Sequence, residues 1–259
     1  MNPALTMRYL NLWLSVVALF LGCSFVYALN AAEGDGNVSS DLSVLKNWQA
    51  GAVVTAEMVE SFGGLDACFV AKPIPDKVWE NMQGKSYKKN PYIGRDDLRI
   101  IYALHWDYDN RIHLGEMICN KKIAGKLVTI LRKLYVHRYP IERMVLPDTF
   151  DSDESQMRAN NSSCFCFRTI ARSNNLSKHA RGLAIDINPL YNPYCKKQKN
   201  GSLLLQPSTA KAYCNRKRDF PYKIERDDYC CRLFKEEGFH WGGDWKSCKD
   251  FQHFEYSEK

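Results

Sequence analysis

The chain has 259 residues, of which 45% are hydrophobic, and this is enough for one domain with a real core. Its formal net charge of +7 comes from dispersed lysines and arginines with only small clusters, such as Arg216-Lys217-Arg218, and no interleaved aromatic–basic motif for nucleic acid. A modest positive field suits an anionic cell-wall polymer or a carboxylate-rich substrate, although a solvated basic surface would have the same composition.

The first 32 residues have the features of an export signal. Arg8 precedes an apolar run from Leu10 to Val26, and small residues follow it. We expect residues 1–32 to be a signal peptide or a retained membrane anchor, since a spanning helix needs about 20 apolar residues. Lipid attachment at Cys23 is a further alternative. The protein is therefore expected to be exported, to the periplasm, the cell envelope or the medium, with possible membrane attachment through its N-terminus.

The remaining chain is expected to form a linker or N-terminal extension at residues 33–61 and one main domain at residues 62–259. Ten cysteines are present, and removal of the export signal leaves nine. An exported chain with so many cysteines typically carries disulfides, so we expect some, with one thiol free or paired between chains. Cys195 with Cys214 is a plausible loop closure, but spacing alone does not define the connectivity.

The hydrophobic pattern predicts secondary structure of both kinds. Residues 44–62 suggest one or two short helices, and the alternation from Leu98 to Tyr108 resumes at Ile112, which predicts a hairpin. Asn120 is placed to cap a helix through Tyr135, in which apolar residues recur at three- and four-residue steps. Pro140 ends this helix, and Ile141 to Leu146 is predicted to be a strand.

The C-terminal half continues the alternation of strands and helices. Leu183 to Ile187 predicts a strand with Asp186 on its less apolar face. A helix is expected from Asp228 to Glu237, closed by Gly238 in the position after its end. We therefore predict an α+β fold, in which a mostly antiparallel sheet carries the functional site and helices pack on one face.

Three side chains have the composition of a catalytic zinc site. His179 stands just before the predicted strand that holds Asp186, and His253 comes from a distant segment. Two imidazoles and one carboxylate leave an open position and a net positive charge, which is the combination that activates water. Taken singly, each residue has an ordinary structural explanation; the joint pattern, with Gly182 between the first two, indicates a metal.

Asp250 is the candidate general base. It stands three residues before His253, close enough to take a proton from water without binding the metal itself. The alternative is that Asp250 only orients His253.

Two motifs contain these residues. The first is Ser177-x-His179-x-x-Gly182-x-Ala184-x-Asp186, and the second is Gly238-Phe239-His240-Trp241-Gly242-Gly243-Asp244-Trp245 followed by Asp250-x-x-His253-Phe254. Together they resemble the D-alanyl-D-alanine carboxypeptidase/dipeptidase and L-alanyl-D-glutamate endopeptidase family of zinc peptidases, which has a hedgehog-like zinc peptidase fold. The resemblance extends over roughly Phe62 to Tyr256.

The resemblance implies a zinc metallopeptidase, a hydrolase with Zn²⁺ at His179, Asp186 and His253 and with Asp250 as its base. It also implies an arginine that steadies a substrate carbonyl or carboxylate. Arg168 matches that position, although it would also serve as a structural arginine. The expected substrate-binding residues are Ser163, Ser177, Tyr191, Trp241 and Trp245, of which the large aromatics would equally suit a core.

The expected substrates are peptidoglycan stem peptides, cleaved at amide bonds that involve D-amino acids. The dipeptidase branch has glutamate where this chain has Asp250, so the L-Ala–D-Glu endopeptidase type is slightly favoured over the D-alanyl-D-alanine carboxypeptidase type. An alternative of another class is a non-catalytic, zinc-containing module that binds cell wall or protein. A disulfide-stabilised domain without metal is a third.

Overall fold

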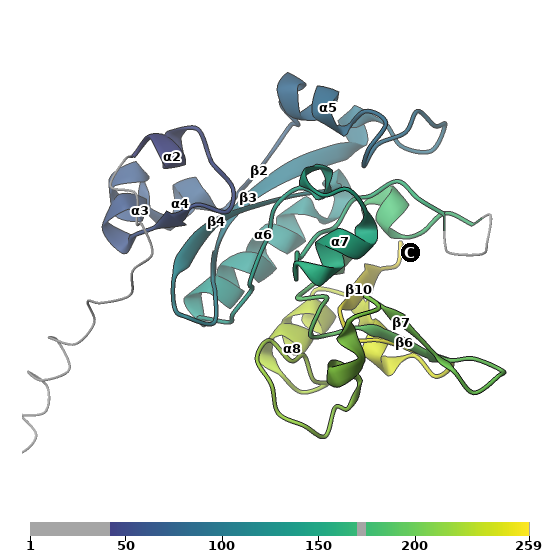
Figure 1. Ribbon diagram of the computed structural model, residues 1–259. Helices are drawn as coiled ribbons and strands as arrows, with labels where there is room; N and C mark the ends of the chain where they lie inside the picture. Colours follow the sequence, from purple (N-terminus) through teal and green to yellow (C-terminus); the bar gives the residue numbers. More distant parts are fainter. Residues whose placement is uncertain (1–41, 170–174, 259) are drawn as a thin grey trace, which may run out of the picture. The chain divides into compact units, whose positions relative to one another are not determined.

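The computed structural model describes residues 42–169 and 175–258; the expected export signal at 1–32 lies outside them. Within these residues the chain forms seven α-helices and ten strands, and every pairing between named strands is antiparallel. The predicted α+β class is therefore confirmed. The strands are divided among three sheets, and the candidate site lies on one of the two small ones (Figure 1).

The described helices are short except for one. They are α2 (Ser43–Lys46), α3 (Ala56–Phe62), α4 (Gly64–Cys68), α5 (Asp76–Met82), α6 (Lys121–Val136), α7 (Asp153–Arg158) and α8 (Tyr229–Glu236). None of these helices combines the length and the apolar character that a bilayer crossing requires. Three 3₁₀ turns matter for the site: η3 (His179–Arg181), η4 (Ala210–Cys214) and η5 (Gly242–Asp244).

The sheets are built from strands of very different length. The largest has the order β1 (Val53–Val54), β4 (Ile112–Asn120), β3 (Leu98–Trp106) and β2 (Val70–Lys72). The second has the order β5 (Ala184–Asp186), β10 (His253–Tyr256) and β8 (Phe239–Trp241). The third has the order β7 (Leu203–Gln206), β6 (Tyr194–Lys197) and β9 (Lys249–Asp250).

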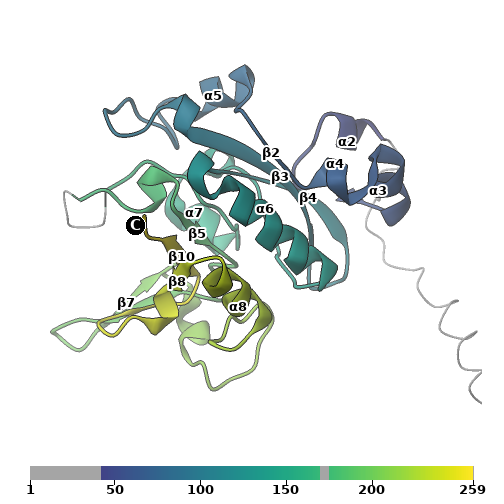
Figure 2. The same cartoon turned by 180° about the vertical axis from the view of Figure 1, so that it is seen from behind.

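The β3–β4 hairpin and α6 form the centre of the fold, as the sequence predicts. The hairpin pairs without interruption from Leu98 opposite Asn120 to Trp106 opposite Ile112. Asn120 then caps α6, because its side-chain oxygen accepts a hydrogen bond from the Lys122 backbone N–H at 3.1 Å. Helix α6 lies across one face of the sheet, as both views show (Figures 1 and 2), and its apolar stripe is buried in the main core.

The sheet is buried on its second face as well. Neighbouring residues of a strand point to opposite faces, and Ile100 and Ile101 are both fully buried in separate apolar clusters. Phe165 joins the cluster of Ile100, and its backbone N–H donates to the Ile118 carbonyl at 2.8 Å. This contact fixes the segment around Phe165 against β4. The chain continues from this segment toward the loop of His179.

The sheet that carries the site packs on α8. Asp228 caps this helix through a hydrogen bond from the Cys231 backbone N–H, and Gly238 follows its end at a φ of +91°. Phe254 in the middle of β10 is fully buried and stacks on Phe234 of α8, with ring centroids 4.2 Å apart. The apolar residue between His253 and Glu255 thus anchors β10, and its neighbours point to the other face of the sheet.

Three expectations differ from the structure in detail. The stretch from Ile141 to Leu146 is not a strand; it makes one isolated bridge, from Arg143 to Asn161. Its hydrogen-bond partners change along its length, because the Ile141 N–H donates to Trp106 whereas the Met144 carbonyl accepts from Glu116. A continuous ladder therefore cannot form.

The expected N-terminal extension also contributes to the main core. From Val44 onward its apolar residues are part of the cluster under α6, and β1 pairs with β4.

The described cysteines are all unbonded in the structure, so the expected disulfides are not among its contacts.

The stability of the fold is expected to depend on pH through Glu116 on β4, because burial raises the pKa of its carboxyl to about 7. In the unfolded chain this carboxyl loses its proton at a lower pH than in the folded chain. The free energy of unfolding therefore falls as the pH rises from the unfolded pKa to the folded pKa of about 7. We expect Glu116→Gln to gain about 1–3 kcal/mol in unfolding free energy over the wild type at about pH 8, but little at about pH 5. Urea unfolding at both pH values measures this, with the exposed Glu80→Gln as control; a gain independent of pH would contradict it.

Candidate metal centre

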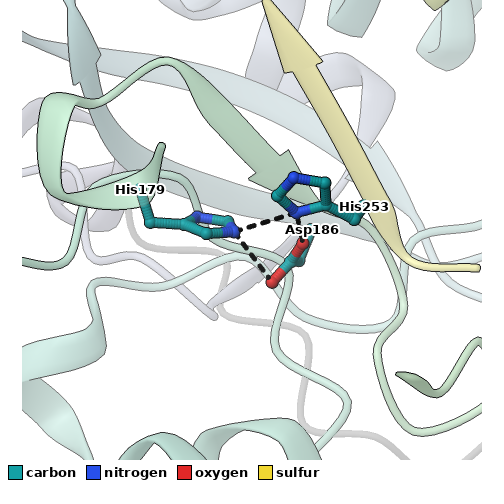
Figure 3. A group of neighbouring side chains, drawn as sticks. All are labelled: His179, Asp186 and His253. Atoms are coloured by element: carbon teal, nitrogen blue, oxygen red, sulfur yellow. Dashed lines mark hydrogen bonds and ion pairs between the residues drawn. The ribbon is translucent and has the colours of Figure 1, made fainter. Parts of the chain in front are cut away.

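His179, Asp186 and His253 meet at one point. His179 Nε2 lies 3.1 Å from His253 Nδ1 and 3.3 Å from Asp186 Oδ2, and His253 Nδ1 lies 3.0 Å from Asp186 Oδ1. Figure 3 shows the three side chains pointing toward one another from η3, β5 and β10. The three residues form a group that is able to hold a metal ion, with one ligand atom each.

Strand pairing brings two of these ligands together. In the antiparallel register of β5 and β10, His253 is directly opposite Asp186, so both side chains point to the same face. The register continues with buried Phe254 opposite Ile185, and a shift by one residue would place a phenylalanine where the ligand stands.

A glycine brings the third ligand into place. Gly182 follows η3 with a φ of +64°, and a Cβ atom there would lie 2.6 Å from the Asn120 backbone nitrogen. The Asn120 N–H donates to the Gly182 carbonyl, and the Asn120 side chain donates to the Arg181 carbonyl. The loop that presents His179 is thus attached to the junction of β4 and α6.

The spacing of the three ligand atoms fits tetrahedral zinc. Ligands at about 2.0–2.1 Å from a tetrahedral ion are about 3.3 Å from one another. The two imidazole nitrogens are 3.1 Å apart, and they lie 3.0 and 3.3 Å from different oxygens of the Asp186 carboxylate, so the group is compact enough for such an ion. Three protein ligands leave the fourth to solvent or substrate.

Both imidazoles are oriented by their second nitrogen. His179 Nδ1 is 2.7 Å from the Cys164 carbonyl, to which it donates, so Nε2 is left to face the other ligands. His253 Nε2 is 3.3 Å from Glu255 Oε2, so its Nδ1 faces the site. The sequence motifs do not indicate Glu255; its signal is its position two residues after His253 on one strand, which places both side chains on one face.

The electrostatics of the ligand set suit a cation. Burial alone would raise the pKa of Asp186, but its interactions with His179 and His253 outweigh burial and hold that pKa well below its usual range. Burial lowers the pKa of His253, whereas hydrogen bonds to Asp186 and Glu255 raise it to about 10. Two carboxylates thus provide negative charge around the imidazoles, as a divalent ion requires.

Asp250 lies beside this centre on β9. Burial raises the pKa of its carboxyl to about 6, and the nearby negative charge of Asp186 acts in the same direction, against the favourable effect of His253. The Gln252 side-chain amide donates to Asp250 Oδ1 at 3.2 Å. A carboxyl with a pKa near neutrality and a fixed orientation has the properties of a general base.

The turn between Asp250 and His253 is held from two sides. A Cβ atom on Gly242 would lie 2.6 Å from the Asp250 carbonyl oxygen and 3.3 Å from His253 Cβ, so only glycine permits this close approach. Arg216 lies over the Phe251 ring at 4.4 Å and donates to the Tyr191 carbonyl. Neither Gly242 nor Arg216 was given a role from the sequence.

A narrow hollow beside the centre is lined by two of the remaining candidates, Ser163 and Arg168. It is lined by Asp153, Gln156, Met157, Asn161, Ser163, Cys166, Arg168, His179, Asp186, Pro189 and Gln252. Arg168 Nε lies 2.8 Å from Asp153 Oδ2, although without hydrogen-bond geometry. Ser163 is fixed because its backbone exchanges two hydrogen bonds with that of Asp186. Gln252 is 2% exposed, and its Oε1 has no hydrogen-bond partner among the described residues.

The other four predicted substrate contacts have positions outside this hollow. Ser177 is buried and accepts a hydrogen bond from the His179 backbone N–H, so it supports the ligand loop. Trp241 is 5% exposed and donates to the Phe251 carbonyl, as a core residue would. Trp245 packs on His253 with ring centroids 5.3 Å apart, whereas Tyr191 packs among other tyrosines. The hollow beside the metal ligands does not include these four residues.

The comparison with known families agrees with this site. Residues 171–256 match the family model described as D-alanyl-D-alanine carboxypeptidase, a family of zinc peptidases, over about a third of the 259 residues. The match includes all three candidate metal ligands and Asp250, and it confirms the resemblance over this segment. It supports peptidase activity, with cell-wall peptides as the class of substrate. No curated protein and no solved structure matches the chain.

Gly242→Ala is expected to weaken metal binding although it replaces none of the ligands. The added methyl group would push against the Asp250 backbone and His253 Cβ, which displaces one ligand relative to the other two. We expect zinc affinity to fall by about 10- to 100-fold, as when support of a ligand is lost. Titration against a competing zinc indicator measures this affinity.

The matched control is Gly125→Ala on α6, where a Cβ atom would meet nothing within 4 Å. This change should leave zinc affinity unaltered and raise helix stability by about 0.5–1 kcal/mol. Equal zinc affinities for both variants would show that Gly242 does not position the ligands.

Proposed function

We propose that this protein is an exported zinc peptidase that hydrolyses amide bonds next to D-amino acids in peptidoglycan stem peptides. The observation that carries the proposal is the convergence of His179, Asp186 and His253, with the carboxyl of Asp250 beside them. The matched family supports the class of reaction and of substrate.

His179, Asp186 and His253 would hold Zn²⁺. When bound, the ion would supply a Lewis acid and would lower the pKa of a water molecule to about 7. Asp250 then acts as general base: it takes the proton of the attacking water and returns it to the amine that leaves. The pKa of about 6 supports this role, because the carboxyl is ionised at neutral pH yet still able to carry the proton.

The hollow beside the centre is the proposed place of the scissile carbonyl. Arg168 lines it and would donate to the carbonyl oxygen as negative charge develops there. The carboxylate of Asp153 is close to this guanidinium, so the positive charge of Arg168 is already partly balanced. A partly balanced arginine suits a carbonyl oxygen better than it suits a free carboxylate, which favours a bond inside the stem peptide.

Two scissile bonds are in question. The description of the matched family, D-alanyl-D-alanine carboxypeptidase, names the terminal D-Ala–D-Ala bond. The aspartate at position 250 and the pairing of Arg168 with Asp153 both favour the internal L-Ala–D-Glu bond. We propose the internal bond as the finer assignment. Export through residues 1–32 and the presence of disulfides belong to the same proposal, since peptidoglycan lies outside the cytoplasm.

Asp250→Asn separates catalysis from binding. We expect turnover of stem peptides to fall by about 10²- to 10⁴-fold, because the amide cannot accept the proton. The zinc content should stay at one ion per chain, because Asp250 is not a ligand. Product formation and metal content are measured on the same preparations, with the exposed Asp151→Asn as control. Equal, negligible turnover by wild type and variant, both zinc-loaded, would favour a non-catalytic binding module.

Product masses identify the bond. With a defined L-Ala–D-Glu–diamino acid–D-Ala–D-Ala peptide, we expect release of free L-alanine from the N-terminus. A chelator should abolish this release, and added Zn²⁺ should restore it. Release of D-alanine would instead assign the carboxypeptidase activity, and release insensitive to the chelator would rule out the metal mechanism.

A further inference from the structure

Two cysteines close to the candidate base lie within reach of each other. Cys195 on β6 and Cys214 at the end of η4 have their Sγ atoms 2.9 Å apart. A disulfide bond has a sulfur–sulfur distance of about 2.05 Å, so a shift of about 1 Å closes it. Other described cysteines have different sulfur contacts: Cys164 with the Gly182 carbonyl, Cys166 with Asp153 and Cys248 with the Ser247 hydroxyl.

Both sulfurs belong to residues that are partly exposed. Cys195 and Cys214 are of intermediate exposure, whereas Cys68, Cys119, Cys164, Cys230 and Cys231 are buried. These two residues are therefore nearer to solvent, and to a small disulfide reagent, than the buried cysteines are.

The pair also lies next to the strand that carries Asp250, because Cys195 is on β6 and β6 pairs with β9. In the antiparallel pairing of β6 with β9, Cys195 is opposite Lys249 and Tyr194 is opposite Asp250. A bond from Cys195 to Cys214 would join this strand to η4 and close a loop that contains the β6–β7 hairpin apart from Tyr194. We propose that Cys195 and Cys214 form a disulfide bond that fixes the strand beside Asp250 to η4.

The bond forms by exchange with a disulfide donor, such as oxidised glutathione. One cysteine thiolate attacks the donor, which gives a mixed disulfide and releases one donor thiol. The second thiolate then attacks the protein sulfur, which forms the Cys195–Cys214 bond and releases the second donor thiol. Two protein thiols are oxidised, and one donor disulfide is reduced to two thiols. Burial raises the pKa of the Cys195 thiol, so we expect oxidation by air alone to be slow at neutral pH.

The test is a mass-spectrometric map of the protein after equilibration with oxidised and reduced glutathione at set ratios. Free thiols are alkylated before digestion. At oxidising ratios we expect the Cys195 and Cys214 peptides to be joined and lighter by two hydrogen atoms than their separate sum. Alkylation of both cysteines at every ratio, or a link from Cys195 to Cys248, would overturn the proposal. This readout is a covalent bond in the wild-type chain, so it is independent of the proposed peptidase activity.

Variants give a second, physical readout. Oxidised wild type should melt roughly 5–15 °C above its reduced form, as expected for a disulfide in a domain of this size. The Cys195→Ser/Cys214→Ser double variant should lose this redox difference, and Cys248→Ser should keep it. A difference that persists in the double variant would assign the effect to other thiols. Amide exchange across residues 194–206 should slow on oxidation of the wild type.

Discussion

The candidate centre depends on the antiparallel pairing of β5 with β10. This single register places His253 opposite Asp186 and, two residues along the same face, Glu255 behind the ring of His253. The apolar residues between them, Ile185 and Phe254, are fully buried and hold the register against α8. The chemistry on one face of the sheet is therefore determined by packing on the other face.

The large sheet contributes to the site at a distance. Its hairpin ends at Asn120, which caps α6 and also contacts the loop of His179 through Gly182. Phe165, attached to β4, directs Cys164 so that its carbonyl accepts from His179 Nδ1. One ligand is thus supported by the central hairpin and helix, whereas the other two belong to the small sheet.

Several parts of this arrangement could be predicted from the sequence, because they depend on local patterns. The hairpin, the capped helix α6, the strand of Asp186 and the helix ended by Gly238 follow from alternation, from helical spacing and from terminal residues. The three ligands were predicted as a group, and they do converge. The division into three sheets could not be predicted, since strand pairing between distant segments has no local signal. The roles of Gly242 and Arg216 have no local signal for the same reason, because they come from contacts across the fold. Glu255 has a local signal, since it lies two residues after His253 on one strand, but no motif points to it.

The position of the ligands along the chain has a thermodynamic consequence. His179 and His253 are 74 residues apart in sequence yet share one site. Because only folding brings these two imidazoles together, an ion that needs both binds the folded chain and not the unfolded one. Such binding stabilises the folded state by an amount that grows with ion concentration. Supply of the proposed zinc ion would thereby control how long the C-terminal sheets stay folded, and so their resistance to proteolysis, as well as their chemistry.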